Sequence, residues 1–155
     1  MTRRWLDETE QHAWRSSLHL HARLSAHLNR QLQNDSGLSL ADFDVLVQLT
    51  DVAAGRVRVL ELSRSLQWEK SRLSHQVRRM EQRGLVVREE CADDGRGAFV
   101  VLTPAGRLAI EAAAPAHVET VRRLVFDGLS REDVDAMGRA ADEVLSRIDA
   151  DEAAR

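Results

Sequence analysis

Apolar residues recur at helical spacing in the first part of the chain, with polar residues between them. From about Asp7 to Gln33, leucines and a tryptophan follow this pattern, which predicts one long amphipathic helix. The stretch NDSG interrupts the pattern, which resumes after Ser39. Ser39 and Asp42 have the spacing of a capping box, so a second helix is expected to run to about Val52.

Two further helices are expected in the middle of the chain. The stretch AAGRV is typical of a loop, and after it Leu60, Leu62 and Leu66 fit a short third helix that ends near Gln67. In the next stretch, SRLSHQVRRMEQRG, the apolar residues gather on one side of a helix drawn at about 100° per residue. Basic and polar residues gather on the other side, and Gly84 is typical of the position after a helix C-terminus. This fourth helix should therefore have one core face and one cationic face.

The hydrophobic period then changes from that of a helix to that of a strand. VVREEC and AFVVLT are strand-length runs separated by ADDGRG, a sequence that favours a turn, so a β-hairpin is expected. Thr103 and Pro104 suit the start of a fifth helix, which Pro115 should kink or interrupt. Ser130 and Asp133 form a capping box before a last helix. Apolar residues alternate steps of three and four along that helix, as in a coiled-coil seam that needs a partner.

This order of elements predicts a mainly α fold with a small β-hairpin wing, a winged helix-turn-helix flanked by N- and C-terminal helices. In such a fold the second helix of the pair enters the major groove of DNA, and its leading residues reach base edges. The charges are placed accordingly, although the formal net charge is −3. From Arg56 to Arg107, eleven Lys or Arg face seven Asp or Glu, a balance of +4, whereas nine acids and four arginines from Asp127 onward give −5. A polyanion should be attracted to the middle of the chain.

Composition narrows the class of protein further. With 155 residues, 43% hydrophobic and 30% charged, the chain is typical of one soluble globular domain. No stretch approaches the roughly 18 uncharged apolar residues of a membrane helix, and the N-terminus lacks the apolar stretch of a signal peptide. The single cysteine, Cys91, excludes an internal disulfide and is expected to be inert. We therefore expect a cytoplasmic protein.

The region from Leu60 to Gly106 resembles the DNA-binding part of the MarR family of bacterial transcriptional regulators. The resemblance rests on MEQRGLV at the end of the fourth helix, DGR in the wing and LTPAG at the entry to the fifth helix, and it extends to LSLADFDVLVQL and the helical ends. It implies a homodimer on a pseudo-palindromic operator in double-stranded DNA. The winged helix would cover about residues 38–106, and the dimerisation helices about 5–34 and 107–150, within a single domain.

The resemblance also implies residue roles in DNA binding. Asp94 would orient Arg96, which would enter the minor groove. The cationic face of the fourth helix supplies the other candidates: Lys70, Ser71, Arg72, Ser74, His75, Arg78, Arg79 and Arg83. Each feature has a plainer interpretation, since a basic face is often only solvated and Asp-Gly-Arg is often an ordinary turn. Where the family usually has a capping serine or threonine, this chain has Glu69, so the helix start is expected near Ser71.

Trp14, Arg15, His19 and Phe43 are candidates for the small-molecule effector pocket that family members place between the dimer helices and the winged domain, although Trp14 and Phe43 also suit the core. The histidines do not have the spacing of a metal site, and we expect no metal and no cofactor. No glycine-rich phosphate loop and no nucleophile beside a base is present, which argues against an enzyme. The leading hypothesis is a dimeric, ligand-responsive repressor or activator, with a repressor released by an effector as the favoured form. The alternative is a winged helix that binds protein and not DNA.

Overall fold

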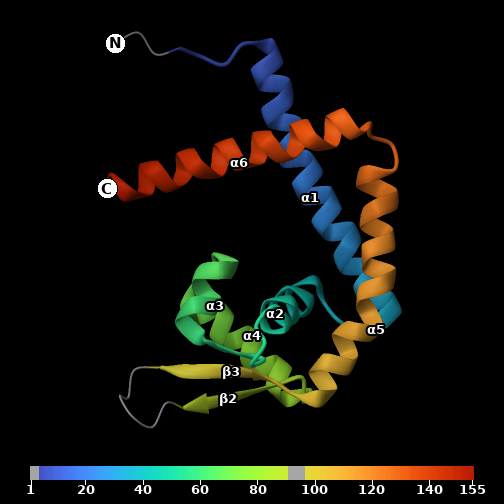
Figure 1. Ribbon diagram of the computed structural model, residues 1–155, viewed down its shortest axis with the longest axis vertical. Helices are drawn as coiled ribbons and strands as arrows, with labels where there is room; N and C mark the ends of the chain where they lie inside the picture. Colours follow the sequence, from blue (N-terminus) through green and yellow to red (C-terminus); the bar gives the residue numbers. More distant parts are fainter. Residues whose placement is uncertain (1–3, 91–96) are drawn as a thin grey trace. The chain divides into compact units, whose positions relative to one another are not determined.

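The computed structural model describes residues 4–90 and 97–155 and divides the chain into two compact units, residues 1–117 and 118–155. Helices dominate both units, as the sequence predicts (Figure 1). The elements are α1 (Glu8–Ser36), α2 (Leu40–Thr50), β1 (Arg56–Arg58), α3 (Val59–Leu66), α4 (Lys70–Gln82), β2 (Val86–Glu90), β3 (Ala98–Leu102), α5 (Pro104–Val121), a π-helical turn (Arg122–Phe126) and α6 (Arg131–Ala153). The boundary between the two units falls within α5.

Capping boxes set the starts of three helices. The Ser39 hydroxyl accepts a hydrogen bond from the Asp42 N–H at 3.0 Å, and the Asp42 carboxylate accepts one from the Ser39 N–H at 2.9 Å. Ser130 and Asp133 form the same pair at α6, and Asp7 forms one at α1. Because each box satisfies N–H groups that have no partner within the helix, it fixes where the helix begins. The predicted boxes at α2 and α6 are confirmed.

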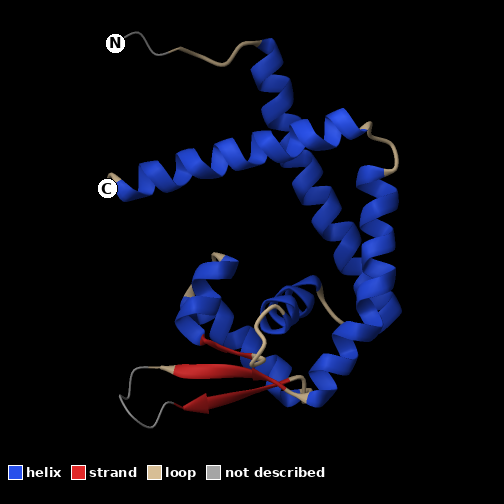
Figure 2. Cartoon of the chain, viewed as in Figure 1, coloured by secondary structure: helices blue, strands red, loops and turns tan. Residues whose placement is uncertain are grey.

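The wing is a three-stranded antiparallel sheet in the order β1-β3-β2 (Figure 2). The hairpin of β2 and β3 is as predicted, but β1 lies where the sequence predicts a loop. β1 is only three residues long and exists because it pairs with β3, Val57 lying opposite Val100. Arg56 and Arg58 flank Val57, and their side chains lie on the face of the sheet opposite to that of Val57, over the ring of Phe99.

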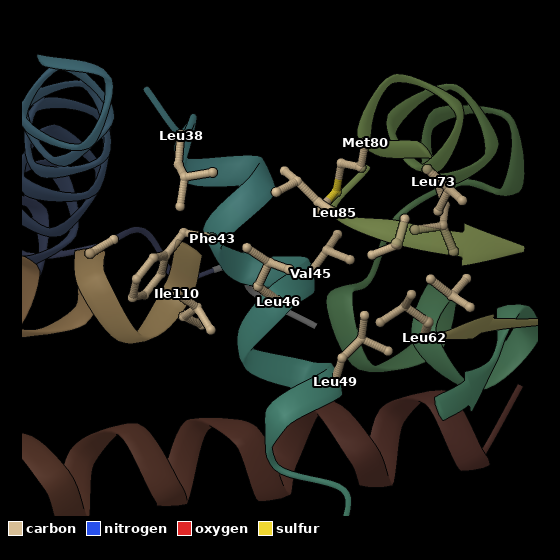
Figure 3. Close-up of a cluster of buried hydrophobic side chains, with 14 of the residues drawn as sticks. Leu38, Phe43, Val45, Leu46, Leu49, Leu62, Leu73, Met80, Leu85 and Ile110 are labelled. Atoms are coloured by element: carbon tan, nitrogen blue, oxygen red, sulfur yellow. The ribbon is translucent and has the colours of Figure 1, made fainter. Parts of the chain in front are cut away.

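The hydrophobic core of the first unit surrounds α2. Figure 3 shows α2 crossing this cluster, with Phe43 turned toward Ile110 of α5. Leu46 and Leu49 of the same helix are completely buried. The other elements contribute the side chains Leu28, Leu32, Leu62, Leu73, Val77, Met80, Leu85, Val86, Val100 and Ala113. The helix α2 therefore lies at the centre of this core, in contact with α1, α3, α4 and the sheet.

The helix α5 runs without interruption through Pro115 to Val121. The sequence predicted that Pro115 would kink or interrupt this helix, and an interruption does not occur. Proline removes one N–H donor from a helix, and the remaining helical bonds of an 18-residue helix can compensate for that loss. The π-helical turn follows only after Val121.

The helix α6 of the second unit buries none of its residues. Met137, Val144 and Ile148 of the predicted seam are 48%, 55% and 46% exposed. A helix with a capped start and an apolar stripe open to solvent is a typical surface for another chain. Among the helices that the structure describes, none is long and apolar enough to cross a membrane.

Candidate nucleic-acid interface

A three-residue turn joins α3 to α4 and completes the helix-turn-helix. The Ser63 hydroxyl donates to the Trp68 carbonyl at 2.6 Å, and the Trp68 N–H donates to the Ser63 carbonyl at 3.1 Å. These two bonds connect the end of α3 to the last residues before α4. Gln67 ends α3 in the left-handed region, with φ of 54°. Glycine adopts this conformation more readily than glutamine, so the bonds between Ser63 and Trp68 help to hold it.

The helix α4 begins at Lys70, and the side chain of Glu69 at the cap position accepts no capping hydrogen bond from the first turn. The sequence correctly indicated a poor cap, and the helix begins one residue before Ser71, near which its start was expected, although Glu69 still occupies the cap position. The backbone of Glu69 accepts a bond from the Leu73 N–H at 3.0 Å, which supports the first turn. With no side-chain cap, the first-turn N–H groups and the positive end of the helix dipole are available to a phosphate.

The core and solvent faces of α4 are clearly separated. Leu73, Val77 and Met80 are buried as predicted, and Gln76 is buried with them. The candidate DNA-binding residues of this helix lie on its exposed side, with Ser74 half-buried at the edge. Those exposed residues are Lys70, Ser71, Arg72, His75, Arg78 and Arg79. The helix therefore presents most of the predicted candidates on one continuous surface.

Most cations of this surface are not neutralised within the chain. Within residues 4–90 and 97–155, Lys70, Arg78 and Arg79 form no ion pair. Arg72 lies over the ring of Trp68, 4.2 Å from its centroid. Burial raises the pKa of the nearby Asp44 carboxyl, and the charge of Arg72 opposes that rise. Unpaired arginines at this spacing are suited to phosphate oxygens, which arginine binds with two parallel hydrogen bonds.

Arg83 differs from the other candidates. Its Nη1 donates to Asp42 Oδ2 at 2.6 Å, and its Nη2 donates to the Gly37 carbonyl at 2.8 Å. The structure thus places Arg83 at the end of α4 against the start of α2. Sequence reasoning missed this pairing, since no local pattern connects residues 41 positions apart.

The wing adds two cations that were not among the candidates. The guanidinium carbon of Arg56 lies 3.9 Å and that of Arg58 4.8 Å from the centroid of the Phe99 ring. Arg56 also pairs with Glu89 at 3.5 Å. The alternation of arginine and valine in RVRV was the available signal for this strand. Asp94 and Arg96, the predicted wing-tip residues, lie outside the described residues.

The segment between α4 and α5 connects the end of α4 to the start of α5 by close backbone contacts. Gly84 has φ of +74°, as expected for the residue after a helix. The Thr103 hydroxyl donates to the carbonyls of Gly84 and Leu85, at 2.6 and 2.9 Å, and accepts from the Gly106 N–H at 3.0 Å. A Cβ atom on Gly106 would overlap the Leu85 carbonyl oxygen, so only glycine allows this close approach.

The predicted effector residues do not form one cluster. Trp14, Arg15 and His19 are exposed on the first half of α1, Trp14 to 57%, whereas Phe43 is buried. The Phe43 ring packs on His117, with centroids 4.3 Å apart, and burial lowers the pKa of that histidine. For Phe43 the core alternative is therefore confirmed.

A cavity of about 650 Å³ lies elsewhere in the first unit, and none of the four predicted effector residues lines it. Its walls come from α1, α2, the turn before α4 and the first turn of α4, including Asn29, Asp44, Trp68 and Arg72. The size is that of a pocket for a small organic molecule. In the described part of the chain, no group of three or more His, Cys, Asp or Glu side chains could hold a metal ion.

These features define a winged-helix protein of the nucleic-acid-binding type: a helix-turn-helix, cations of α4 that form no ion pair in the described residues, and a small antiparallel sheet. The model of the MarR family matches residues 36–97. AbsC from Streptomyces coelicolor, a MarR family transcriptional regulator, is 39% identical, with a TM-score of 0.88 over 96% of this chain and 99% of that one. The chain therefore belongs to the MarR family of transcriptional regulators.

Two further solved structures extend the comparison. Sco3205, a MarR family regulator from Streptomyces coelicolor solved in complex with DNA, is 40% identical, with a TM-score of 0.88 over 93% of this chain and 90% of that one. A mutant MarR from E. coli, complexed with operator DNA, is 23% identical, with a TM-score of 0.75 over 84% of this chain and 91% of that one, and shows the fold alone. A search of curated protein sequences found no match.

Proposed function

We propose that this protein is a sequence-specific DNA-binding repressor that acts as a homodimer and is released from a pseudo-palindromic operator by a small-molecule effector. The exposed cations of α4 carry the proposal, because Lys70, Arg78 and Arg79 have no ion pair in the described residues. The 40% identity to a regulator solved with DNA supports it.

The expected binding mode follows from the geometry of α4, which we call the recognition helix from here on. Its first-turn residues would reach base edges in the major groove, and Arg78 and Arg79 would bind phosphates. Arg96 of the wing would enter the minor groove beside them, oriented by Asp94. Two such modules about one helical turn of DNA apart would bind the two halves of the operator.

The homodimer is supported by apolar surface that a single chain leaves open. Met137, Val144 and Ile148 of α6 are about half exposed, and so are Trp14 and Leu18 of α1. Apolar stripes on two long helices are suited to packing against the same helices of a second copy. The seam also explains why α6 carries no buried residue of its own.

The cavity beside the recognition helix supports control by an effector. Trp68 and Arg72 line it from the DNA-binding side, and Asn29 and Asp44 line it from α1 and α2. A molecule bound there would contact the first turn of the recognition helix, so it would favour one orientation of that helix. By linkage, an effector that weakens DNA binding must itself bind more weakly to the DNA complex.

A DNA-binding assay on substituted protein tests the proposal. Arg79→Ala and Arg96→Ala should each weaken binding to operator DNA, whereas light scattering should still report a dimer. Arg139→Ala is a matched control, because it removes the same charge from an exposed position on α6. If both arginine variants bind DNA as the wild type does, the protein-binding winged helix becomes the better explanation.

A further inference from the structure

The carboxylate of Asp42 joins the start of α2 to the recognition helix. Asp42 is 3% exposed, and its Oδ1 accepts a hydrogen bond from Gln76 Nε2 at 2.6 Å. Its Oδ2 accepts from the Ser39 N–H at 2.9 Å and from Arg83 Nη1 at 2.6 Å. Two of the three donors thus belong to the recognition helix or its C-terminal cap, and one belongs to the start of α2.

This arrangement goes beyond what a helix cap requires. A capping box needs only the two reciprocal hydrogen bonds between Ser39 and Asp42, and it works with an exposed carboxylate. Here the carboxylate is buried, which costs free energy unless charge and hydrogen bonds compensate it. Burial alone would raise the pKa of Asp42, but the hydrogen bonds from Ser39 and Arg83 and the charge of Arg83 lower it overall. The site is therefore built around an ionised carboxylate.

The two donors from the recognition helix are placed to orient it. Gln76 and Arg83 are seven residues apart, so they lie on the same side of the helix and about 10 Å apart along its axis. Two anchored residues on one side of the helix restrain its direction and keep that side turned toward Asp42. Arg83 extends the connection to the Gly37 carbonyl at the end of α1.

Hydrogen bonds within the chain distinguish Arg83 from the exposed arginines. At about 100° per residue, Arg83 lies roughly 140° around the helix from Arg78 but only about 40° from Arg79, so its partners and not its side of the helix set it apart. Both terminal nitrogens of Arg83 already donate within the chain, whereas Arg78 and Arg79 form no ion pair in the described residues. The guanidinium of Arg83 is therefore held by the first unit itself, whereas those of Arg78 and Arg79 are open to a ligand.

We propose that Asp42, Gln76 and Arg83 form a positioning site that fixes the recognition helix on α2, so that Arg83 contributes to operator selection through Asp42 and not through a phosphate. The inference rests on the proposed DNA-binding function. Base readout needs side chains held within about 0.5 Å of the productive position, and phosphate attraction does not. Loss of the site should therefore reduce discrimination between sequences more than it reduces binding to DNA in general.

The test compares two duplexes of equal length by fluorescence anisotropy at several salt concentrations. One duplex is enriched from a random library by the wild-type protein, and the other is unselected. The variants are Asp42→Asn, Arg83→Gln and their combination. Arg79→Gln is the matched control, because it removes the same charge from the same helix at a position without an ion pair in the described chain.

The expected results differ in kind. Asp42→Asn and Arg83→Gln should each lower affinity for the selected duplex by about tenfold and leave affinity for the unselected duplex and the salt slope close to wild type. The combination should lose no more than the worse single variant, since both changes break one site. Arg79→Gln should weaken both duplexes equally and reduce the salt slope by about 1.

A purely structural defect would have another signature, because a smaller folded fraction weakens both duplexes by the same factor. Arg83 is 43% exposed, so Arg83→Gln keeps the test decisive even if Asp42→Asn does not fold. If Arg83→Gln reproduces Arg79→Gln, Arg83 is a phosphate contact and the inference is overturned, with the proposed function intact. If the wild type binds neither duplex, the proposed function fails and the inference fails with it.

Discussion

Gly106 offers a direct test of how the recognition helix and wing are held against α5. A Cβ at this position would lie 2.9 Å from Leu102 Cδ1 and would overlap the Leu85 carbonyl oxygen. In Gly106→Ala, α5 would have to move on the order of 1 Å to restore normal contact. That movement would strain the bonds between Thr103 and the Leu85 carbonyl, which are 2.9 and 3.2 Å long.

The expected cost follows from these contacts. Overpacking costs about 1–3 kcal/mol, and each weakened hydrogen bond adds about 0.5–1.5 kcal/mol. Alanine is favoured over glycine in a helix by up to about 1 kcal/mol, which offsets part of the cost. We therefore expect Gly106→Ala to lower the free energy of unfolding by about 2–4 kcal/mol, equivalent to a fall in Tm of roughly 5–15 °C for a chain of this size.

Urea unfolding followed by circular dichroism, at one fixed protein concentration, measures this difference. Gly138→Ala is the matched control, since a Cβ on Gly138 of α6 meets no atom within 4 Å in the chain. The control should be neutral or stabilising by up to about 1 kcal/mol. If Gly106→Ala is as stable as Gly138→Ala, the close approach of Gly106 to Leu85 does not constrain the fold and the reasoning is wrong.

Three further predictions concern Asp42, His117 and the α6 seam. Asp42→Asn should lower the free energy of unfolding by about 1–3 kcal/mol at neutral pH. Because folding lowers the pKa of Asp42 from its ordinary 3.8, the difference in stability from wild type should close as the pH falls through the folded-state pKa. Urea unfolding at each pH measures this difference, and a difference that stays constant would contradict the prediction. Burial lowers the pKa of His117 from its ordinary 6.5, so wild type should lose stability relative to His117→Phe as the pH falls below 6.5, and parallel pH profiles would refute this. Ile148→Glu should shift the dimer toward monomer by about tenfold or more in dissociation constant, measured by analytical ultracentrifugation, whereas an unchanged constant would exclude this stripe from the interface.

Local patterns in the sequence were sufficient for most of the secondary structure. Each of the useful signals acts within a few residues, so it can be recognised from the sequence alone. These signals are the capping boxes at Ser39 and Ser130, the glycine after α4 and the change of hydrophobic period at the wing. The amphipathic pattern of α4 also predicted which side would be exposed. This is why the cationic surface could be assigned before the structure was known.

Features that depend on distant partners could not be predicted in this way. The strand β1 exists because Val57 pairs with Val100, and the role of Arg83 depends on Asp42. Gln76 is buried because its amide has a carboxylate partner on α2, which sequence periodicity cannot indicate. Trp14 has an apolar side chain at helical spacing. This pattern does not distinguish a residue of the chain's own core from a residue at an interface with a second chain.

The central claim is that the exposed cations of the recognition helix and wing bind duplex DNA. Affinity for a duplex enriched from a random library, measured between 50 and 200 mM salt, tests it most directly. If a dimer neutralises about 6–10 phosphates, affinity should fall by roughly 10³–10⁵ over this range. An affinity that does not change with salt, or no binding at 50 mM salt, would contradict the claim.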